Sequence, residues 1–239
     1  MANFLAWSYS RWKTFRECPG KLWHTAVAPR GHPDRVDYVE TDAMRAGKEI
    51  DDALTRRIRD GAPLPAKFAR HEALAQLVIA HPGHKITQAQ FALDQAFRSC
   101  GYKDWDNAWV RVIFDLTIID DKRGWIWDWK NGKISIDADQ LKLFAAVGFH
   151  QFPSLEVIDT SYVWLAHDTI SPEVYYRREL PELWANFLPT VERMQVSFKT
   201  GHWPKTPGNK TPDGVSVCKW CEVNKAGKCP VASVIYGGR

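Results

Sequence analysis

No stretch of this 239-residue sequence is apolar for the length needed to cross a membrane, and no basic flank followed by an apolar run opens it. The sequence also lacks internal repeats, low-complexity tracts and the glycine-rich loop that cradles nucleotide phosphates. Its eight histidines are scattered and follow no metal-ligand spacing. These absences argue against membrane proteins, repeat proteins and nucleotide-driven motors, and we expect a soluble intracellular protein.

The cysteine content argues against a disulfide-rich scaffold, because the sequence has five cysteines, an odd number. Three of them form Cys-x2-Cys-x7-Cys at Cys218, Cys221 and Cys229. A cluster this tight is typical of a metal site, but three thiolates leave a tetrahedral site one ligand short. Cys18 supplies the missing thiolate, whereas Cys100 has no cysteine near it in sequence and is expected to be a plain thiol. Zinc and an iron–sulfur cluster both suit four thiolates.

Charge is distributed unevenly around a net value of +4. Residues 1–35 carry six Lys/Arg against two acidic residues, and residues 199–239 carry seven against two, so the ends hold +9 and the middle holds −5. Basic ends around an acidic centre suit a nucleic-acid backbone held against a metal-binding core, although merely polar ends would show the same imbalance. A four-cysteine site would also join residues 1–35 and 200–239 into one stapled subregion.

The apolar pattern predicts one α/β domain spanning residues 1–239, since hydrophobic residues make up 45% of the sequence. We expect a sheet flanked by helices, with a Pro- and Gly-containing connector at 200–217 leading to a small cysteine-bound tail. Helices are predicted at 8–18, 41–60, 65–81, 138–150 and from Pro181 through Met194. Strands are predicted at 85–93, 109–119, 125–130, 157–166 and 173–178.

The most informative segment is a predicted β-hairpin whose arms, 109–119 and 125–130, are rich in aromatic and β-branched residues and flank Asp-Asp-Lys-Arg-Gly. Asp115 interrupts an apolar run in the first arm, where an unpartnered charge would be costly. Asp128 and Lys130 are two apart in the second arm, so they share one face of the strand, and the neighbouring tryptophans share the other.

Two carboxylates and a lysine on adjacent strands can converge on one point. There the carboxylates bind a hard cation and the lysine lies beside its bound water, which suits metal-assisted hydrolysis, above all of a phosphodiester. The alternative is a solvated face, which is common on hairpins. Asp51 is a further candidate ligand on a helix, unless it belongs to an exposed acidic turn. Gln90 is either a weak ligand or a surface amide, and Gln140 either contacts DNA or simply begins a helix.

In their order along the chain, these motifs resemble the RecB-like branch of the PD-(D/E)XK nuclease superfamily. The likeness is to its iron–sulfur members, which include the CRISPR spacer-acquisition nucleases, AddB-type nuclease domains and many phage exonucleases. It covers nearly the whole chain, because the cysteines bracket it. The motifs that carry it are Cys18-Pro19, Gly47-x-x-Ile50-Asp51, Asp115, Asp128-x-Lys130, Gln140-x-x-x-Phe144, Cys218-x-x-Cys221 and Cys229-Pro230.

The resemblance implies a restriction-endonuclease-like core and a metal-dependent DNA nuclease, expected to act as an exonuclease in recombination, repair or processing. Asp115 and Asp128 would bind Mg²⁺ or Mn²⁺, with Asp51 and the backbone carbonyl of Trp129 as further ligands, and Lys130 would orient or activate the attacking water. Gln140 would help to place DNA. The four cysteines would hold a [4Fe–4S] cluster, with structural Zn²⁺ as the alternative.

Three positions depart from the family pattern. Asp51 stands where histidine is usual, Phe144 where tyrosine is usual, and Gln90 where related nucleases often have glutamate. The Asp–Asp–Lys set is intact, so we expect an active enzyme with altered metal preference. The alternative is a DNA-binding or assembly module with a vestigial site. Expected partners are DNA and a helicase, annealing or integrase protein, in the cytoplasm of a bacterial cell or of the host if a phage encodes the protein.

Overall fold

The computed structural model describes residues 3–134, 137–207 and 216–229. The chain separates into two units, the first made of residues 40–186 and the second of residues 2–39 and 187–239. Pro230 of the last cysteine motif and residues 208–215 of the expected connector lie outside the described part. No helix in that part is long and apolar enough to cross a membrane.

A six-stranded mixed sheet forms the first unit, in the order β2-β1-β3-β4-β5-β6. All neighbouring strands are antiparallel except β4 and β5, which run parallel. A parallel pair needs a crossover connection, and the helix α5 (Asp139–Gln151) supplies it. The strands are β1 His84–Leu93, β2 Ser99–Cys100, β3 Val110–Asp120, β4 Arg123–Lys130, β5 Val157–Trp164 and β6 Thr169–Tyr176.

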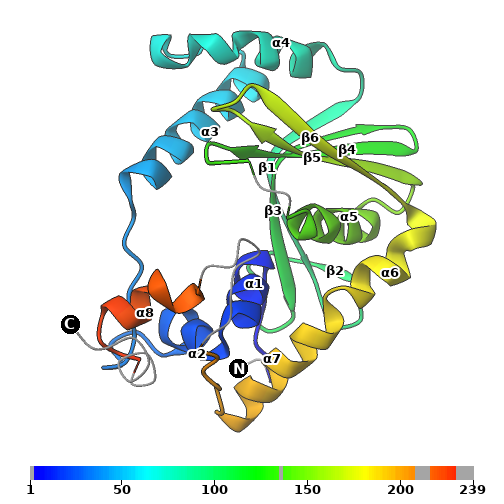
Figure 1. Cartoon of the computed structure of the whole chain (residues 1–239). Helices are drawn as coiled ribbons and strands as arrows, with labels where there is room; N and C mark the ends of the chain where they lie inside the picture. Colours follow the sequence, from blue (N-terminus) through cyan, green and yellow to red (C-terminus); the bar gives the residue numbers. More distant parts are fainter. Residues whose placement is uncertain (1–2, 135–136, 208–215, 230–239) are drawn as a thin grey trace. The chain divides into compact units, whose positions relative to one another are not determined.

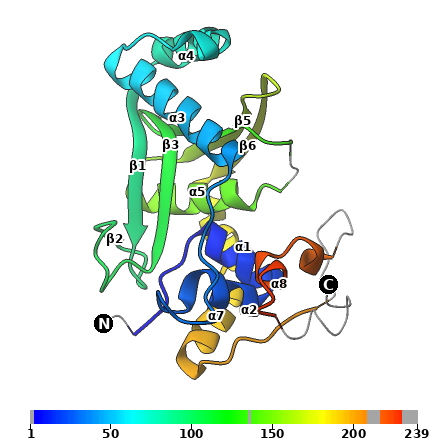
Figure 2. The same ribbon diagram turned by 90° about the vertical axis from the view of Figure 1, so that its left-hand side faces the viewer.

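Helices cover both faces of this sheet, with α3 and α4 on one side and α5 on the other (Figures 1 and 2). The helix α3 (Asp42–Asp60) begins where the Thr41 side chain accepts the N–H of Met44 at 3.3 Å, and it ends at Gly61 in the left-handed conformation. A 3-10 helix, Ala66–His71, leads into α4 (Glu72–Ala80). The short helix α6 (Leu180–Ala185) is the last element of this unit along the chain.

One face of the hairpin is buried in the core beneath α3 and α4. Trp127 and Trp129 point into it, so the prediction that they share a face opposite Asp128 and Lys130 is confirmed. The sheet contributes β-branched, leucine and tryptophan side chains that pack against apolar residues of both helices. The buried members of this cluster are Ile50, Leu54, Ala75, Val78, Leu116, Ile118, Trp127, Trp129, Val163 and Leu165.

Most predicted elements of the first unit are present, including the hairpin and the helices at 41–60 and 138–150. The hairpin turn is tighter than predicted, because Asp120 already pairs with Arg123. The prediction of one long helix from Pro181 through Met194 is wrong, because this segment forms two helices, α6 and α7 (Leu188–Thr200). Pro189 lies in the first turn of α7, where its missing N–H cannot continue the preceding helix.

The second unit is helical and brings segments from both ends of the chain together. It contains α1 (Tyr9–Glu17), α2 (Pro19–Leu22), a π-helical turn Trp23–Val27, α7, a 3-10 turn Val217–Lys219 and α8 (Glu222–Lys225). The backbone of Leu5 exchanges two hydrogen bonds of 2.8 Å with the Gln195 amide. The Trp12 indole donates to the Phe187 carbonyl at 3.3 Å, and the two rings pack edge to face.

Candidate metal centre

Four polar residues form one row across the middle of the sheet. The pairing of β1 with β3 skips Gln88 and Asp115, which lie between the pairs Thr87–Leu116 and Ala89–Phe114. Extending the hairpin register by one step places Asp115 opposite Asp128, and Asp128 pairs directly with Tyr162 of β5. The register therefore sets two carboxyls, an amide and a phenol at one level across four neighbouring strands, and we call this level, which Asp51 of α3 joins, the carboxyl row.

Asp115 lies where the hairpin opens. The pairing of β3 with β4 ends at Leu116, and the Asp115 carboxylate accepts the N–H of Trp129 at 2.8 Å in place of a backbone carbonyl. Phe114 packs on Phe144 of α5, with ring centroids 4.8 Å apart, whereas Leu116 packs beneath α3 and α4. The alternation of the strand therefore breaks at Asp115, which explains how a charged residue fits into an apolar run.

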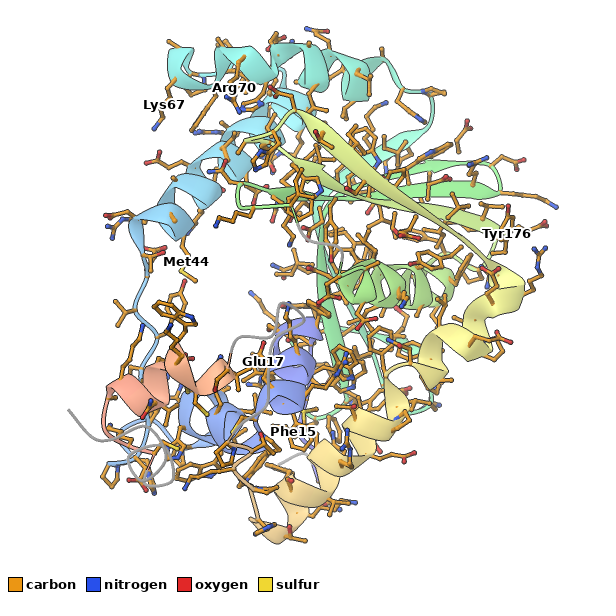
Figure 3. The ribbon with its side chains drawn as sticks, viewed as in Figure 1. Phe15, Glu17, Met44, Lys67, Arg70 and Tyr176 are labelled. Atoms are coloured by element: carbon orange, nitrogen blue, oxygen red, sulfur yellow. The ribbon has the colours of Figure 1, made fainter. Side chains whose placement is uncertain are left out.

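The helix α3 brings Asp51 to the same place. Asp51 lies about two turns after Met44, which Figure 3 labels. Gln88 Nε2 donates to both carboxylate oxygens of Asp51, at 2.8 Å and 3.0 Å, and reaches Asp115 Oδ1 at 3.5 Å. One amide thus links a carboxyl of the helix to a carboxyl of the sheet.

Lys130, Asp128 and Gln140 form a closed triangle beside this group. Lys130 Nζ lies 2.5 Å from Asp128 Oδ2 and donates to Gln140 Oε1 at 3.1 Å. Gln140 Nε2 donates to Asp128 Oδ1 at 3.0 Å. Lys130 Nζ also lies 5.3 Å from the centre of the Tyr162 ring. Every polar end of Gln140 is therefore occupied within the site.

Burial raises the pKa of all three carboxyls, and repulsion from neighbouring carboxyls adds to the shift at Asp115 and Asp51. The pKa of Asp115 is raised to about 8, first by burial and then by the charges of Asp128 and Asp51. The pKa of Asp51 is raised to about 6 by burial, Asp52 and Asp128. Burial also raises the pKa of Asp128, against the opposing attraction of Lys130. Three carboxyls thus share one lysine, and this excess of negative charge fits a hard divalent cation.

Hydrogen-bond donors stand among these carboxyls in the structure. Within the described residues, no three His, Cys, Asp or Glu side chains are arranged to hold a metal ion as they stand. The Gln88 amide lies between Asp51 and Asp115, while Lys130 and Gln140 contact Asp128. These donors therefore contact the carboxylate oxygens that a bound cation would use as ligands.

The structure brings together Asp51, Asp115, Asp128, Lys130 and Gln140, all of which were predicted site residues. Of the two alternatives for Gln90, the structure favours the surface amide: Gln90 is exposed, and Gln88 contacts the carboxylates instead. A regular strand would put Gln88 and Gln90 on one face. Gln88 instead has a left-handed backbone, with φ of +51°, which a non-glycine residue rarely adopts and which no sequence pattern announced.

The four cysteines predicted to bind metal line one cavity of about 20 Å³ in the second unit. Cys18 follows α1, and the other three belong to the segment around α8, namely Cys218, Cys221 and Cys229. Burial raises the pKa of the Cys221 thiol. Cys100 lies on β2 of the first unit. All four cysteines line this cavity, but among the described residues they are not arranged as a metal-binding group, so the cluster stays a prediction.

Comparison with solved structures finds a similar fold over nearly the whole chain. A crystal structure named as a putative exonuclease from Eubacterium rectale is 13% identical, with a TM-score of 0.52, and the match covers 98% of this chain and 94% of that one. A structure of the protein SSO0001 is 11% identical over 68% of this chain and 67% of its own, with a TM-score of only 0.37. No family model and no curated protein matches the sequence.

The shifted carboxyls predict how stability depends on pH in protein dialysed free of divalent cations. Because the pKa of Asp115 is raised, the folded state binds more protons than the unfolded state between about pH 4 and pH 8, and the free energy of unfolding falls as pH rises through that window. Asp115→Asn keeps an acceptor for the Trp129 N–H and removes the charge. When the pH is raised from 5.5 to 8.5, the free energy of unfolding in urea should fall less for the variant than for the wild type. We expect the two decreases to differ by at least about 1 kcal/mol.

Asp106→Asn is the matched control, because Asp106 is exposed and lies in the connection between β2 and β3, outside the strands that carry the carboxyl row. This control is expected to follow the pH slope of the wild type. The difference between variant and wild type cancels contributions from other titrating groups, including the buried His71 and the half-buried His150, whose pKa values are lowered by burial. Equal slopes for Asp115→Asn and the wild type would contradict the prediction.

Proposed function

We propose that this protein is a divalent-metal-dependent deoxyribonuclease of the iron–sulfur, RecB-like branch of the PD-(D/E)XK nucleases. The observation that carries the proposal is the meeting of Asp115, Asp128 and Lys130 on two strands of one hairpin, with Asp51 added from α3. This set suits hydrolysis of a phosphodiester, whose charged phosphate needs a cation and whose attacking water needs a nearby base or amine.

Asp51, Asp115 and Asp128 would hold Mg²⁺ or Mn²⁺, with the carbonyl of Trp129 as an additional oxygen ligand. Hard cations of this kind prefer carboxylate and carbonyl oxygens. When bound, the cation supplies neutralisation of phosphate charge and a more acidic water. Three carboxyls balanced by one lysine support this assignment, because the added positive charge would relieve their repulsion.

Lys130 is the residue assigned to the attacking water. Its amine is held by Asp128 on one side and by the Gln140 carbonyl on the other, above the Tyr162 ring. These contacts fix the amine beside the carboxyl row, where it can orient a water and stabilise charge on a phosphate oxygen. Gln140 would then act mainly by positioning Lys130 and Asp128, and contact DNA only when its amide exchanges one of these partners.

Exonuclease action on DNA in recombination, repair or processing is the form of the activity that we favour. The fold shared with the Eubacterium rectale protein supports it, since that protein carries an exonuclease name. The cytoplasm of a bacterium, or of a phage-infected host, is the proposed location. A helicase, annealing protein or integrase is the proposed kind of protein partner.

The cysteine cavity of the second unit is proposed to hold a [4Fe–4S] cluster through Cys18, Cys218, Cys221 and Cys229, with Zn²⁺ as the alternative. Four thiols from two distant segments line one small cavity, which supports a shared metal. Such a metal would tie the beginning of the chain to its end and so stabilise the helical unit.

Cleavage of labelled single- and double-stranded DNA with Mg²⁺ or Mn²⁺ tests the nuclease proposal. Asp128→Asn and Lys130→Met are each expected to lower the rate at least about 100-fold, because each removes a charge placed for the reaction. Lys122→Met is the matched control: Lys122 lies in the turn of the same hairpin, is exposed, and is expected to leave the rate unchanged.

Folding of each nuclease variant is checked by its thermal midpoint. Wild-type activity in folded Asp128→Asn or Lys130→Met would refute the proposed site. DNA binding without metal-dependent cleavage in the wild type would instead support the assembly-module alternative.

Metal analysis of anaerobically purified protein tests the cysteine proposal. We expect brown protein containing about four irons per chain, and loss of colour and iron in Cys229→Ser. Cys100→Ser, which alters the cysteine on β2, is expected to keep both. Colourless protein with one zinc per chain would select the zinc alternative, and protein with neither metal would contradict the shared site.

A further inference from the structure

Gln88 has a backbone conformation that an ordinary strand residue avoids. Its φ of +51° lies in the left-handed region, although Gln88 carries a β-carbon and belongs to the middle of β1. Residues in that region are costly, persist only where their surroundings impose them, and cluster at functional sites. Gln90, two residues further along β1, has an exposed side chain, which leaves Gln88 as the glutamine of β1 that reaches the carboxyl row.

The Gln88 side chain contacts two carboxyls that repel one another. Its Nε2 lies 2.8 Å and 3.0 Å from the oxygens of Asp51 and 3.5 Å from Asp115 Oδ1. The NH₂ end of the amide therefore supplies the positive polarity that holds a carboxyl of α3 beside a carboxyl of β3. A divalent cation at the same position would do this more strongly.

A carboxamide has a donor end and an acceptor end, and a half-turn about its terminal bond exchanges them. Between two carboxylates the donor end is favoured, and beside a cation the oxygen end is favoured. A glutamate at this position would serve only as a ligand, and would add a further negative charge whenever the cation is absent. A hydrocarbon side chain would serve in neither state.

We propose that Gln88 is a reversible placeholder for the divalent cation: its NH₂ group joins Asp51 to Asp115 in the metal-free protein, and its amide oxygen turns to the cation when one binds. This inference rests on the proposed function, because it requires a cation among these carboxyls. Gln88 is thus a positioning residue that keeps the site assembled between binding events, while giving weaker cation binding than a carboxylate would give.

Gln88→Glu tests this role through two measurements that should move in opposite directions. In Mn²⁺ titration by calorimetry, the variant is expected to bind about tenfold more tightly, because a carboxylate replaces an amide oxygen. In protein dialysed free of divalent cations at pH 8, its thermal midpoint is expected to fall by about 4 °C, because the bridging donor becomes a charge. Gln90→Glu adds the same charge two residues away at an exposed position, and should change neither quantity.

Gln88→Met removes both ends of the amide while keeping the length of the side chain. It is expected to lower the cation-free midpoint and also to weaken Mn²⁺ binding. Should Gln88→Glu fail to fold without cations, its midpoint in saturating Mn²⁺ is expected to equal or exceed that of the wild type, and a lower value would overturn the inference.

Two further outcomes separate this inference from the function on which it rests. Mn²⁺ affinity unchanged by Gln88→Glu, or a cation-free midpoint unchanged by Gln88→Met, would overturn the placeholder role and leave the metal site intact. A wild-type protein that binds no Mn²⁺ would overturn the proposed function itself.

Discussion

Repulsion among three closely placed carboxyls, one buried and two half-buried, is the constraint on which the first unit depends. Asp51 comes from a helix, and Asp115 and Asp128 come from the two arms of a hairpin. Burial makes their charges costly, and it raises the pKa of each of the three carboxyls. Each carboxyl is therefore matched to a donor, from the Gln88 amide, the Trp129 backbone or the Lys130 amine.

We propose that this arrangement accepts a divalent cation in place of part of its hydrogen bonding. The neutral Gln88 amide is the donor that joins Asp51 and Asp115. A cation would displace a neutral amide at a lower cost in free energy than it would displace a fixed positive charge. Lys130 is held separately by Asp128, Gln140 and Tyr162, so its amine does not depend on the amide bridge. The site thus has two parts, one proposed to receive the metal and one proposed to prepare the water.

Much of this site could be predicted from the sequence, because strand periodicity relates residues two apart. Asp128 and Lys130 fall on one face for that reason, and the neighbouring tryptophans on the other. The left-handed backbone at Gln88 could not be predicted, since it is imposed by contacts with α3 and β3 rather than by local preference. The same limit applies to the helix after Pro181, where regular apolar spacing hid the interruption at Pro189.

The second unit shows how a small helical region can depend on contacts between distant segments. Leu5 is hydrogen-bonded to Gln195, and Trp12 is hydrogen-bonded to Phe187. Each of these two distant segments therefore supplies hydrogen-bond partners for the other. The four cysteines follow the same logic, with one from the first segment and three from the last lining a single cavity. A metal in that cavity, as proposed, would close a loop of about two hundred residues and restrict the unfolded chain.

The most direct test of the carboxyl site is anomalous diffraction from crystals soaked in Mn²⁺. A manganese peak within coordination distance of Asp51, Asp115 and Asp128, with the Gln88 amide oxygen turned towards it, is the predicted result. A peak bound elsewhere, or carboxyls that remain bridged by the Gln88 NH₂ group at saturating Mn²⁺, would contradict the central claim.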